Sequence, residues 1–143
     1  MKIKSVTLQG FMSFKNKQTL NLENYSNGLH FITGQNLINP RLGANACGKS
    51  TLIESITACF FNKTSFNTKT NDIISWGTEE SKFCEVSLVL EKLNIDYCIQ
   101  RTWKPSNLFI TNITTNQIET VTQEKLEEFL ECNFESFLYS VHI

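Results

Sequence analysis

The chain has 143 residues, a length that predicts a single domain. Hydrophobic residues make up 41% of the sequence and charged residues 19%, so the chain can bury a core and wholesale disorder is excluded. The formal net charge of −1 excludes a global basic field for nucleic acid but not a local patch, and the apolar runs are too short to span a bilayer.

The five cysteines include no CxxC pair, which favours buried thiols in a reducing compartment over a disulfide framework or a zinc site. The N-terminus also lacks an apolar signal core, so we expect a cytoplasmic protein without a membrane partner. No His, Asp and Glu cluster has the spacing of a nuclease metal site, so we expect no DNA cleavage by this chain alone.

Alternation of apolar and polar residues between Gly- and Asn-rich turns predicts most of the strands. In chain order, the predicted strands are 3–9, 18–22, 29–33, 83–90, 95–102, 108–113 and 117–121. Turns near 92–94 and at 114–116 predict two hairpins, 83–90 with 95–102 and 108–113 with 117–121. The run 29–33 is short and uninterrupted, so we interpret it as a buried strand with His30 as a core histidine. The apolar segment 137–143 is a candidate for one further, parallel strand.

Two helices are predicted from an apolar period near 3.6 residues. The first begins at Lys49, and its apolar face is expected to hold Leu52, Ile53, Ile56, Cys59 and Phe60. The polar residues between them are expected elsewhere: Glu54, Ser55 and Thr57. The second helix follows a cap at Thr120 or Thr122, with an apolar face made of Leu126, Phe129 and Leu130.

Residues 43–50 match the phosphate-binding pattern GxxxxGK[ST], between a predicted strand and a predicted helix. The residues are Gly43, Ala44, Asn45, Ala46, Cys47, Gly48, Lys49 and Ser50. Glycines let successive N–H groups point at phosphates, and the helix N-terminus adds its dipole. Lys49 should then reach the β- and γ-phosphates, Ser50 should ligate Mg²⁺, and Thr51 can donate to the α-phosphate. The alternative is a glycine-containing loop that merely precedes a helix.

Several segments together resemble a known family. They are LQGFMSFKNKQTLNL at 8–22, GLHFITG at 28–34, the GKS loop, STLIESI at 50–56, and two phenylalanines followed by a basic stretch. This pattern resembles the N-terminal part of SbcC-type ATPases. These are ABC-type subunits of DNA-repair and recombination nuclease complexes, including phage exonuclease subunits, and they are related to SMC proteins. The resemblance covers essentially the whole chain.

The resemblance implies an α/β P-loop NTPase fold, with residues 1–143 forming the N-terminal lobe of an ABC-type ATPase head that carries an antiparallel β-layer. The C-terminal lobe and a coiled coil would lie outside this sequence. ATP and Mg²⁺ are the implied cofactors, and Lys49 is the implied catalytic residue once the second lobe completes the head. The implied partners are a second ATPase head, a metal-dependent SbcD-like nuclease subunit, and DNA. The implied location is the cytoplasm, which is that of the host if the protein is phage-encoded.

The sequence departs from the family pattern at several positions. Gly34-Gln35-Asn36 resembles a first start of the loop, so we interpret 35–42 as an insertion that forms a surface excursion. Ala46 stands where relatives usually carry Gly, and Met12 stands where many carry an Arg near the nucleotide. The family's Q-loop glutamine would follow residue 143.

Some residues keep two interpretations. Ser75 and Trp76 lie in a region that touches base and ribose in relatives, so Trp76 either stacks on adenine or packs against the β-layer. Arg101 either contacts nucleotide or DNA, or is a solvated or paired charge. Lys63 and Lys69 either touch DNA phosphates or belong to a solvated loop.

Cys47 is either reactive beside Lys49 or a small loop residue.

Two rival functions also stand: a non-catalytic nucleotide-binding interaction module, and another P-loop ATPase such as a RecF-like DNA-repair protein. In each case too few parallel strands flank 29–33, so we expect an unfinished sheet whose exposed apolar surface promotes association.

Overall fold

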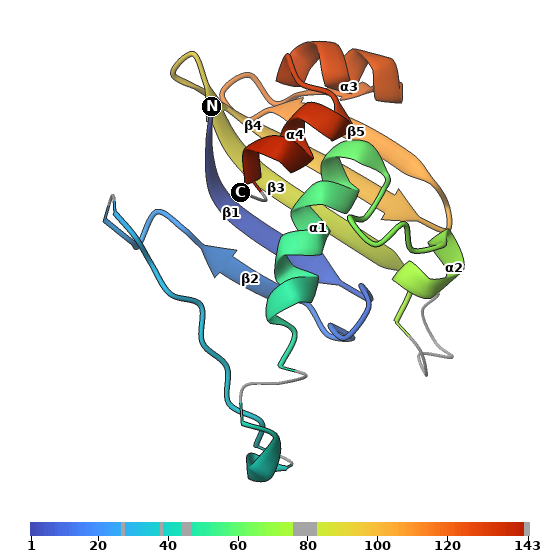
Figure 1. Ribbon diagram of the computed structural model, residues 1–143. Helices are drawn as coiled ribbons and strands as arrows, with labels where there is room; N and C mark the ends of the chain where they lie inside the picture. Colours follow the sequence, from blue (N-terminus) through green and yellow to red (C-terminus); the bar gives the residue numbers. More distant parts are fainter. Residues whose placement is uncertain (27, 38, 44–46, 76–82, 142–143) are drawn as a thin grey trace.

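The computed structural model describes residues 1–26, 28–37, 39–43, 47–75 and 83–141. The strands are β1 (Lys2–Gln9), β2 (Gln18–Asn21), β3 (Cys84–Lys92), β4 (Ile95–Trp103), β5 (Asn107–Asn112) and β6 (Gln117–Thr120). The helices are α1 (Lys49–Phe61), α2 (Thr70–Ile73), α3 (Gln123–Leu130) and α4 (Phe134–Val141), with a short 3-10 helix, η1 (Pro40–Leu42). Figure 1 shows α1 lying across one face of the sheet, with α4 beside it.

The described strands form one antiparallel sheet in the order β2-β1-β3-β4-β5-β6. The register aligns a row of apolar side chains across five strands: Leu20, Val6, Leu88, Ile99 and Ile110. Alternate residues of β3 are buried, as expected for strands with one covered face. The predicted hairpins are confirmed, because each depends on a local turn and a two-residue alternation.

The helix predicted from Lys49 is confirmed, and Cys59 and Phe60 are buried as predicted, but the rest of its buried face differs from the prediction. Its buried residues are Glu54, Ser55, Thr57, Ala58, Cys59, Phe60 and Phe61. The predicted residues Leu52, Ile53 and Ile56 are only half-buried. The polar side chains are accommodated by hydrogen bonds: the Ser55 hydroxyl donates to the Leu52 carbonyl at 2.6 Å, and Glu54 accepts from the Ser65 amide at 2.7 Å.

The segment 137–143 was a candidate strand, and this prediction is wrong for its described part, which belongs to α4. Phe134 and Phe137 are three residues apart and therefore share one helical face. Their rings contact Phe60 and Phe61 at centroid distances of 5.3 to 5.8 Å. The prediction for α3 is confirmed, because Thr122 caps it by accepting from the Lys125 amide, and Leu126 and Leu130 are buried.

The predicted buried strand at 29–33 is wrong. The structure assigns no strand there, and Leu29 and Phe31 are 85% and 84% exposed. His30 is exposed rather than in the core, with its Nε2 atom 2.7 Å from the Ser26 carbonyl. An extended segment becomes a strand only by pairing, and no described strand pairs with this one.

Residues 35–42, predicted to be a surface excursion, are exposed or half-buried wherever their side chains are described. The Asn36 amide donates to the Gly43 carbonyl at 3.1 Å, which closes the excursion at its base. The Asn36 side chain also accepts from the Asn39 amide at 2.8 Å, a turn that favours this sequence locally.

Lys4 lies on the polar face of the sheet among three carboxylates. Its Nζ is 2.8 Å from Asp96, 3.2 Å from Glu91 and 3.6 Å from Glu23. Hydrogen bonds to Asp96 and Glu91 raise the pKa of Lys4 above its ordinary value. These contacts connect β1 with β3, with β4 and with Glu23, two residues after the end of β2.

All five cysteines are free thiols, as predicted. Cys59 and Cys84 are buried, and burial raises the pKa of each to about 12. The Cys59 thiol lies between α1 and the sheet, 3.5 Å from the Val86 carbonyl. Among the described helices, none has both the length and the apolar character needed to cross a membrane.

Candidate functional site

The turn after β1 is held in shape by Gly10. Gly10 adopts a left-handed backbone with φ of 63°, and a Cβ there would lie 2.1 Å from the Phe83 carbonyl oxygen. No other residue could therefore occupy this position without moving the start of β3. Phe11 is buried against Trp103 with ring centroids 5.7 Å apart, and two backbone hydrogen bonds join it to Phe14.

This turn covers the N-terminus of α1. Gly48, the N-cap residue, has φ of 80°, and a Cβ there would approach two Phe14 ring carbons to 3.0 Å and the Ser13 hydroxyl to 3.2 Å. Glycine is required for both its left-handed backbone and its lack of a side chain. The Ser13 hydroxyl also lies 3.4 Å from the Thr51 hydroxyl, so the GFMSF turn and the GKS motif are in direct contact.

The first turn of α1 begins at Lys49 and Ser50, as the sequence predicted. The first N–H groups of a helix lack partners within it, and the helix dipole places partial positive charge at the same end. A glycine, a lysine and a hydroxyl at such a terminus are suited to an anion with an associated cation. Ser50 is exposed and Lys49 is half-buried.

Among the predicted phosphate-loop residues, the structure describes Gly43 and, beyond 44–46, Cys47, Gly48, Lys49, Ser50 and Thr51. The Cys47 thiol points at the Gly43 carbonyl at 3.9 Å, so the two sides of the loop approach each other. Three predicted site residues lie outside the described residues: Ala44, Asn45 and Ala46. Cys47 is half-buried, and both interpretations of it, a reactive thiol and a small loop residue, still stand.

Ser75 lies against the GFMSF turn. It is buried, and its amide donates to the Gly10 carbonyl at 2.8 Å. Next to it, the Met12 amide donates to the Ile73 carbonyl at 2.7 Å, so α2 is fixed to the same turn. Trp76, the candidate for adenine stacking, lies outside the described residues.

Arg101 has a role that the sequence analysis missed. Its side chain is only 6% exposed, so it is not presented to DNA as a solvated charge. Its guanidinium donates to the Cys59 carbonyl at 2.7 Å, to the Phe60 carbonyl at 3.3 Å and to the Gln123 side chain at 2.6 Å. It therefore satisfies carbonyls at the C-terminus of α1 and joins α1 to α3. Arg101 lies two residues after Ile99 on β4, so the alternation of the strand places it on the same inward face; this is the feature of the sequence that indicated its burial.

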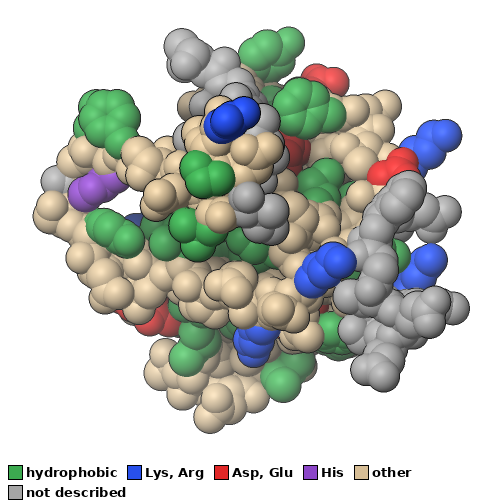
Figure 2. Space-filling model, turned by 90° about the horizontal axis from the view of Figure 1, so that it is seen from below, with side chains coloured by type: hydrophobic (Ala, Val, Ile, Leu, Met, Phe, Trp, Pro, Cys, Tyr) green, Lys and Arg blue, Asp and Glu red, His purple; other side chains and the backbone are tan. Residues whose placement is uncertain are grey.

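Basic residues near the site are dispersed. Lys63 is exposed and lies 5.2 Å above the Phe134 ring, and Lys69 is exposed just before α2. Figure 2 shows the Lys and Arg side chains spread singly over the face seen from below, with hydrophobic side chains between them. In the described ranges, no group of three or more His, Cys, Asp or Glu residues is placed to hold a metal ion.

A phosphate-loop motif at a helix N-terminus, under a turn that contacts it directly, is typical of nucleotide-binding folds. The sequence matches the model of a family described as an AAA domain over residues 5–142. The chain belongs to the AAA domain family. No curated protein sequence matches that of this AAA domain.

Solved structures also resemble this AAA domain. One is the SMC head domain from Thermotoga maritima, with a TM-score of 0.59 and 21% identity, over 90% of this chain and 42% of that chain. Another is the recombination mediator protein RecF-ATP of the RecFOR pathway, with a TM-score of 0.54 and 18% identity, over 87% of this chain and 30% of that chain. The AAA domain described here therefore spans less than half the length of these structures. The predicted α/β P-loop ATPase fold with an antiparallel sheet is confirmed.

Proposed function

We propose that this AAA domain binds ATP with Mg²⁺ through residues 43–51. The observation that carries the proposal is the start of α1 at Lys49, directly after a left-handed Gly48 beneath Ser13 and Phe14. In this proposal Lys49 contacts the β- and γ-phosphates, Ser50 supplies a hydroxyl ligand to Mg²⁺, and Thr51 contacts the α-phosphate. Residues 44–46 complete the loop, and Ser75 and Trp76 are candidates for the base and ribose side.

The proposal is tested by titration calorimetry of ATP into the full chain. Lys49→Ala should weaken binding by about 2 kcal/mol, roughly 30-fold in Kd, because a charge-assisted contact to phosphate is lost. Lys15→Ala removes an equal charge from an exposed position in the turn after β1 and should leave the Kd unchanged. An unchanged Kd in Lys49→Ala would discard the phosphate-loop assignment.

We further propose that residues 1–143 are the N-terminal lobe of an SMC- or RecF-type ATPase head that acts on DNA. The coverage of 42% of an SMC head supports this proposal, as do the exposed apolar residues at 28–37. A second lobe would pair with 28–33 and would supply the groups that position the attacking water. Hydrolysis, with Lys49 as the catalytic residue, should then appear only when that lobe is added.

Light scattering of the purified chain tests whether residues 1–143 are a lobe that is incomplete without a second one. The chain should associate as its concentration rises, because an unpaired edge and an exposed apolar patch both promote association. The double variant Leu29→Ser, Phe31→Ser should associate less, whereas Ile118→Ser, on the opposite edge of the sheet, should not differ from the parent. A concentration-independent monomer with high thermal stability contradicts the incomplete lobe.

The SbcC-like form of the proposal adds a second head, a metal-dependent SbcD-like nuclease subunit and DNA as partners. Its support is the resemblance of residues 8–22 and 50–56 to that family. A RecF-like ATPase would share the fold and the phosphate loop but would need no nuclease subunit. Co-purification of the complete protein with a metal-dependent nuclease activity distinguishes the two, since only the SbcC-like form predicts it.

A further inference from the structure

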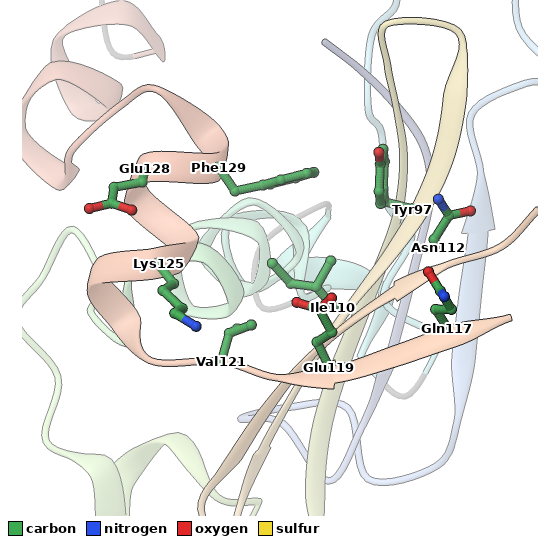
Figure 3. Close-up of a pocket in the computed structure, with 9 residues that line it drawn as sticks. All are labelled: Tyr97, Ile110, Asn112, Gln117, Glu119, Val121, Lys125, Glu128 and Phe129. Carbon is green, nitrogen blue, oxygen red and sulfur yellow. The ribbon is translucent and has the colours of Figure 1, made fainter. Parts of the chain in front are cut away.

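A hollow of about 580 Å³ lies between α3 and strands β4 to β6, away from the phosphate loop. It is lined by Tyr97, Ile110, Asn112, Gln117, Glu119, Val121, Lys125, Glu128 and Phe129. Figure 3 shows Phe129 reaching from α3 toward Tyr97, while Glu128 turns outward. Its volume is sufficient for several side chains of a bound segment.

The inner wall of this hollow is apolar and its rim is polar. Tyr97 and Phe129 meet edge to face with centroids 4.9 Å apart, and Ile110 and Val121 are both half-buried beside them. An apolar centre surrounded by polar groups is the usual arrangement of a protein interface. The hollow therefore favours a segment with apolar side chains as its occupant.

The charge around the hollow is one-sided. Residues 117–141 contain six acidic residues and one lysine, so the rest of the chain, with eight acidic and twelve basic residues, is net positive. Glu131 is paired with Lys92 at 2.7 Å. Within 117–141, the exposed carboxylates without an ion pair to any described residue are Glu119, Glu124, Glu128 and Glu135. Such a surface repels phosphate groups and attracts a basic partner.

The sheet ends beside the hollow at β6. The only partner of β6 among the described strands is β5, and all four residues of β6 are exposed. The free side of such a strand can accept an extended peptide through main-chain hydrogen bonds. Alternate side chains of that peptide would share the face of Gln117 and Glu119, and would therefore face the hollow.

We propose that the hollow and the free edge of β6 dock an extended, basic segment of a partner protein. Its apolar side chains enter the hollow against Tyr97, Ile110 and Phe129, and its lysines or arginines face Glu119 and Glu128. Lys125, the one cation of the lining, can donate to a main-chain carbonyl of the segment. This docking site is independent of the nucleotide function proposed above.

Fluorescence anisotropy with labelled nine-residue peptides and the full chain tests the proposal. The Lys-Leu peptide, Leu-Ser-Lys-Ser-Leu-Ser-Lys-Ser-Leu, places its leucines and lysines on one face of an extended strand and should bind. The same peptide with Glu in place of Lys (the Glu-Leu peptide), or with Ser in place of Leu (the Lys-Ser peptide), should not. Equal binding of the Lys-Ser peptide would overturn the proposal, because it would show attraction by net charge alone. Equal binding of the Glu-Leu peptide would overturn the basic character of the partner.

Two pairs of variants locate the contact. Glu119→Lys with Glu128→Lys should weaken binding of the Lys-Leu peptide about tenfold or more, because two facing charges are reversed. Glu124→Lys with Glu135→Lys makes the same change in net charge outside the lining and should weaken it much less. Equal loss in both pairs would overturn the proposal.

The apolar wall is tested in the same way. Ile110→Ser should weaken binding, while Ile118→Ser, on the opposite face of the same hairpin, should not. Circular dichroism establishes that each variant is folded, and the exposed glutamate variants still decide the outcome if Ile110→Ser unfolds. Binding that is unaffected in both the glutamate pair and Ile110→Ser would place the peptide elsewhere.

Discussion

The antiparallel sheet and the segment 28–37 are similarly rich in apolar residues but end in opposite environments. Val6, Leu88 and Ile99 of the sheet are fully buried, whereas Phe31 and Leu37 are more than 80% exposed. Each sheet strand finds its partner through a hairpin or through the β1–β3 pairing, while no described strand lies against 28–33. An apolar run thus shows that a surface favours burial, but not which part of a molecule buries it.

The largest expected contrast is between Phe11, in the turn after β1 and buried against Trp103 of the sheet, and Phe31 of the segment 28–37. Phe11→Ala should lower the free energy of unfolding by about 4 kcal/mol, because Phe11 is fully buried and packs against Trp103. Phe31→Ala should change it by less than about 0.5 kcal/mol, because the side chain is 84% exposed. Urea unfolding followed by far-UV circular dichroism measures both. A large loss in Phe31→Ala would mean that the segment already packs in the isolated chain.

A second contrast uses Arg101, in β4 of the sheet, and Arg41, in η1, which follows the segment 28–37 along the chain. Arg101→Met should cost about 3 kcal/mol, because it deprives the Cys59 carbonyl of its buried side-chain donor and removes the guanidinium contacts to Phe60 and Gln123. Arg41→Met, at an exposed position of η1, should cost less than about 0.5 kcal/mol. Arg101→Lys keeps the charge but cannot reproduce the forked contacts, so its loss should be nearly as large. The same urea titrations decide, and equal stability of the two methionine variants would contradict the capping role.

Alkaline pH should lower the free energy of unfolding through Cys59, whose thiol lies where α1 packs on the sheet. Burial raises the pKa of its thiol from 9.0 to about 12, so between these values the folded chain keeps a proton that the unfolded chain releases. Stability is therefore full below pH 9 and falls as pH rises, by at most about 1.4 kcal/mol per pH unit. Cys59→Ala should show a shallower decline between pH 9 and 10 in urea titrations. Parallel declines in the variant and the parent would refute this assignment.

The smallest effect is expected from removing the excursion. Deletion of residues 34–42 should leave the Kd for ATP within about threefold and stability within about 1 kcal/mol, because long surface loops contribute little closure entropy. The hydrogen bond between the Asn36 amide and the Gly43 carbonyl already holds the ends together. Calorimetry and thermal unfolding measure both quantities. Lost binding in a folded deletion variant would instead make Gln35 and Asn36 candidate ligands.

The sequence predicted the features that depend on neighbouring residues. The hairpins of β3 with β4 and of β5 with β6, the start of α1 at Lys49 and the Thr122 cap all follow from local periodicity and turn chemistry. The strand at 29–33 was predicted wrongly, because pairing depends on a partner that the run itself does not specify. The helix α4 was taken for a strand, because a short apolar run fits either period.

Buried polar groups were also beyond prediction from the sequence. Glu54 and Arg101 look like surface charges in a helical or strand pattern, and only distant partners, Ser65 and the end of α1, make their burial favourable. Within the candidate site, the position of the GKS segment at the start of a helix was predicted correctly. The packing of Phe14 on Gly48 was not anticipated, because it joins residues more than thirty positions apart.

Because carboxylates surround Lys4, the rate at which its amine is acylated reports whether the sheet around it is intact. Amine-reactive reagents attack only the deprotonated amine, and the raised pKa of Lys4 suppresses that form while β1, β3 and β4 stay together. Lys15 and Lys17, exposed in the turn after β1, carry no such cage of described acids. The ratio of acylation at Lys4 to that at Lys15 therefore registers, within one polypeptide and by mass spectrometry, whether the first hairpin is still joined to the rest of the sheet.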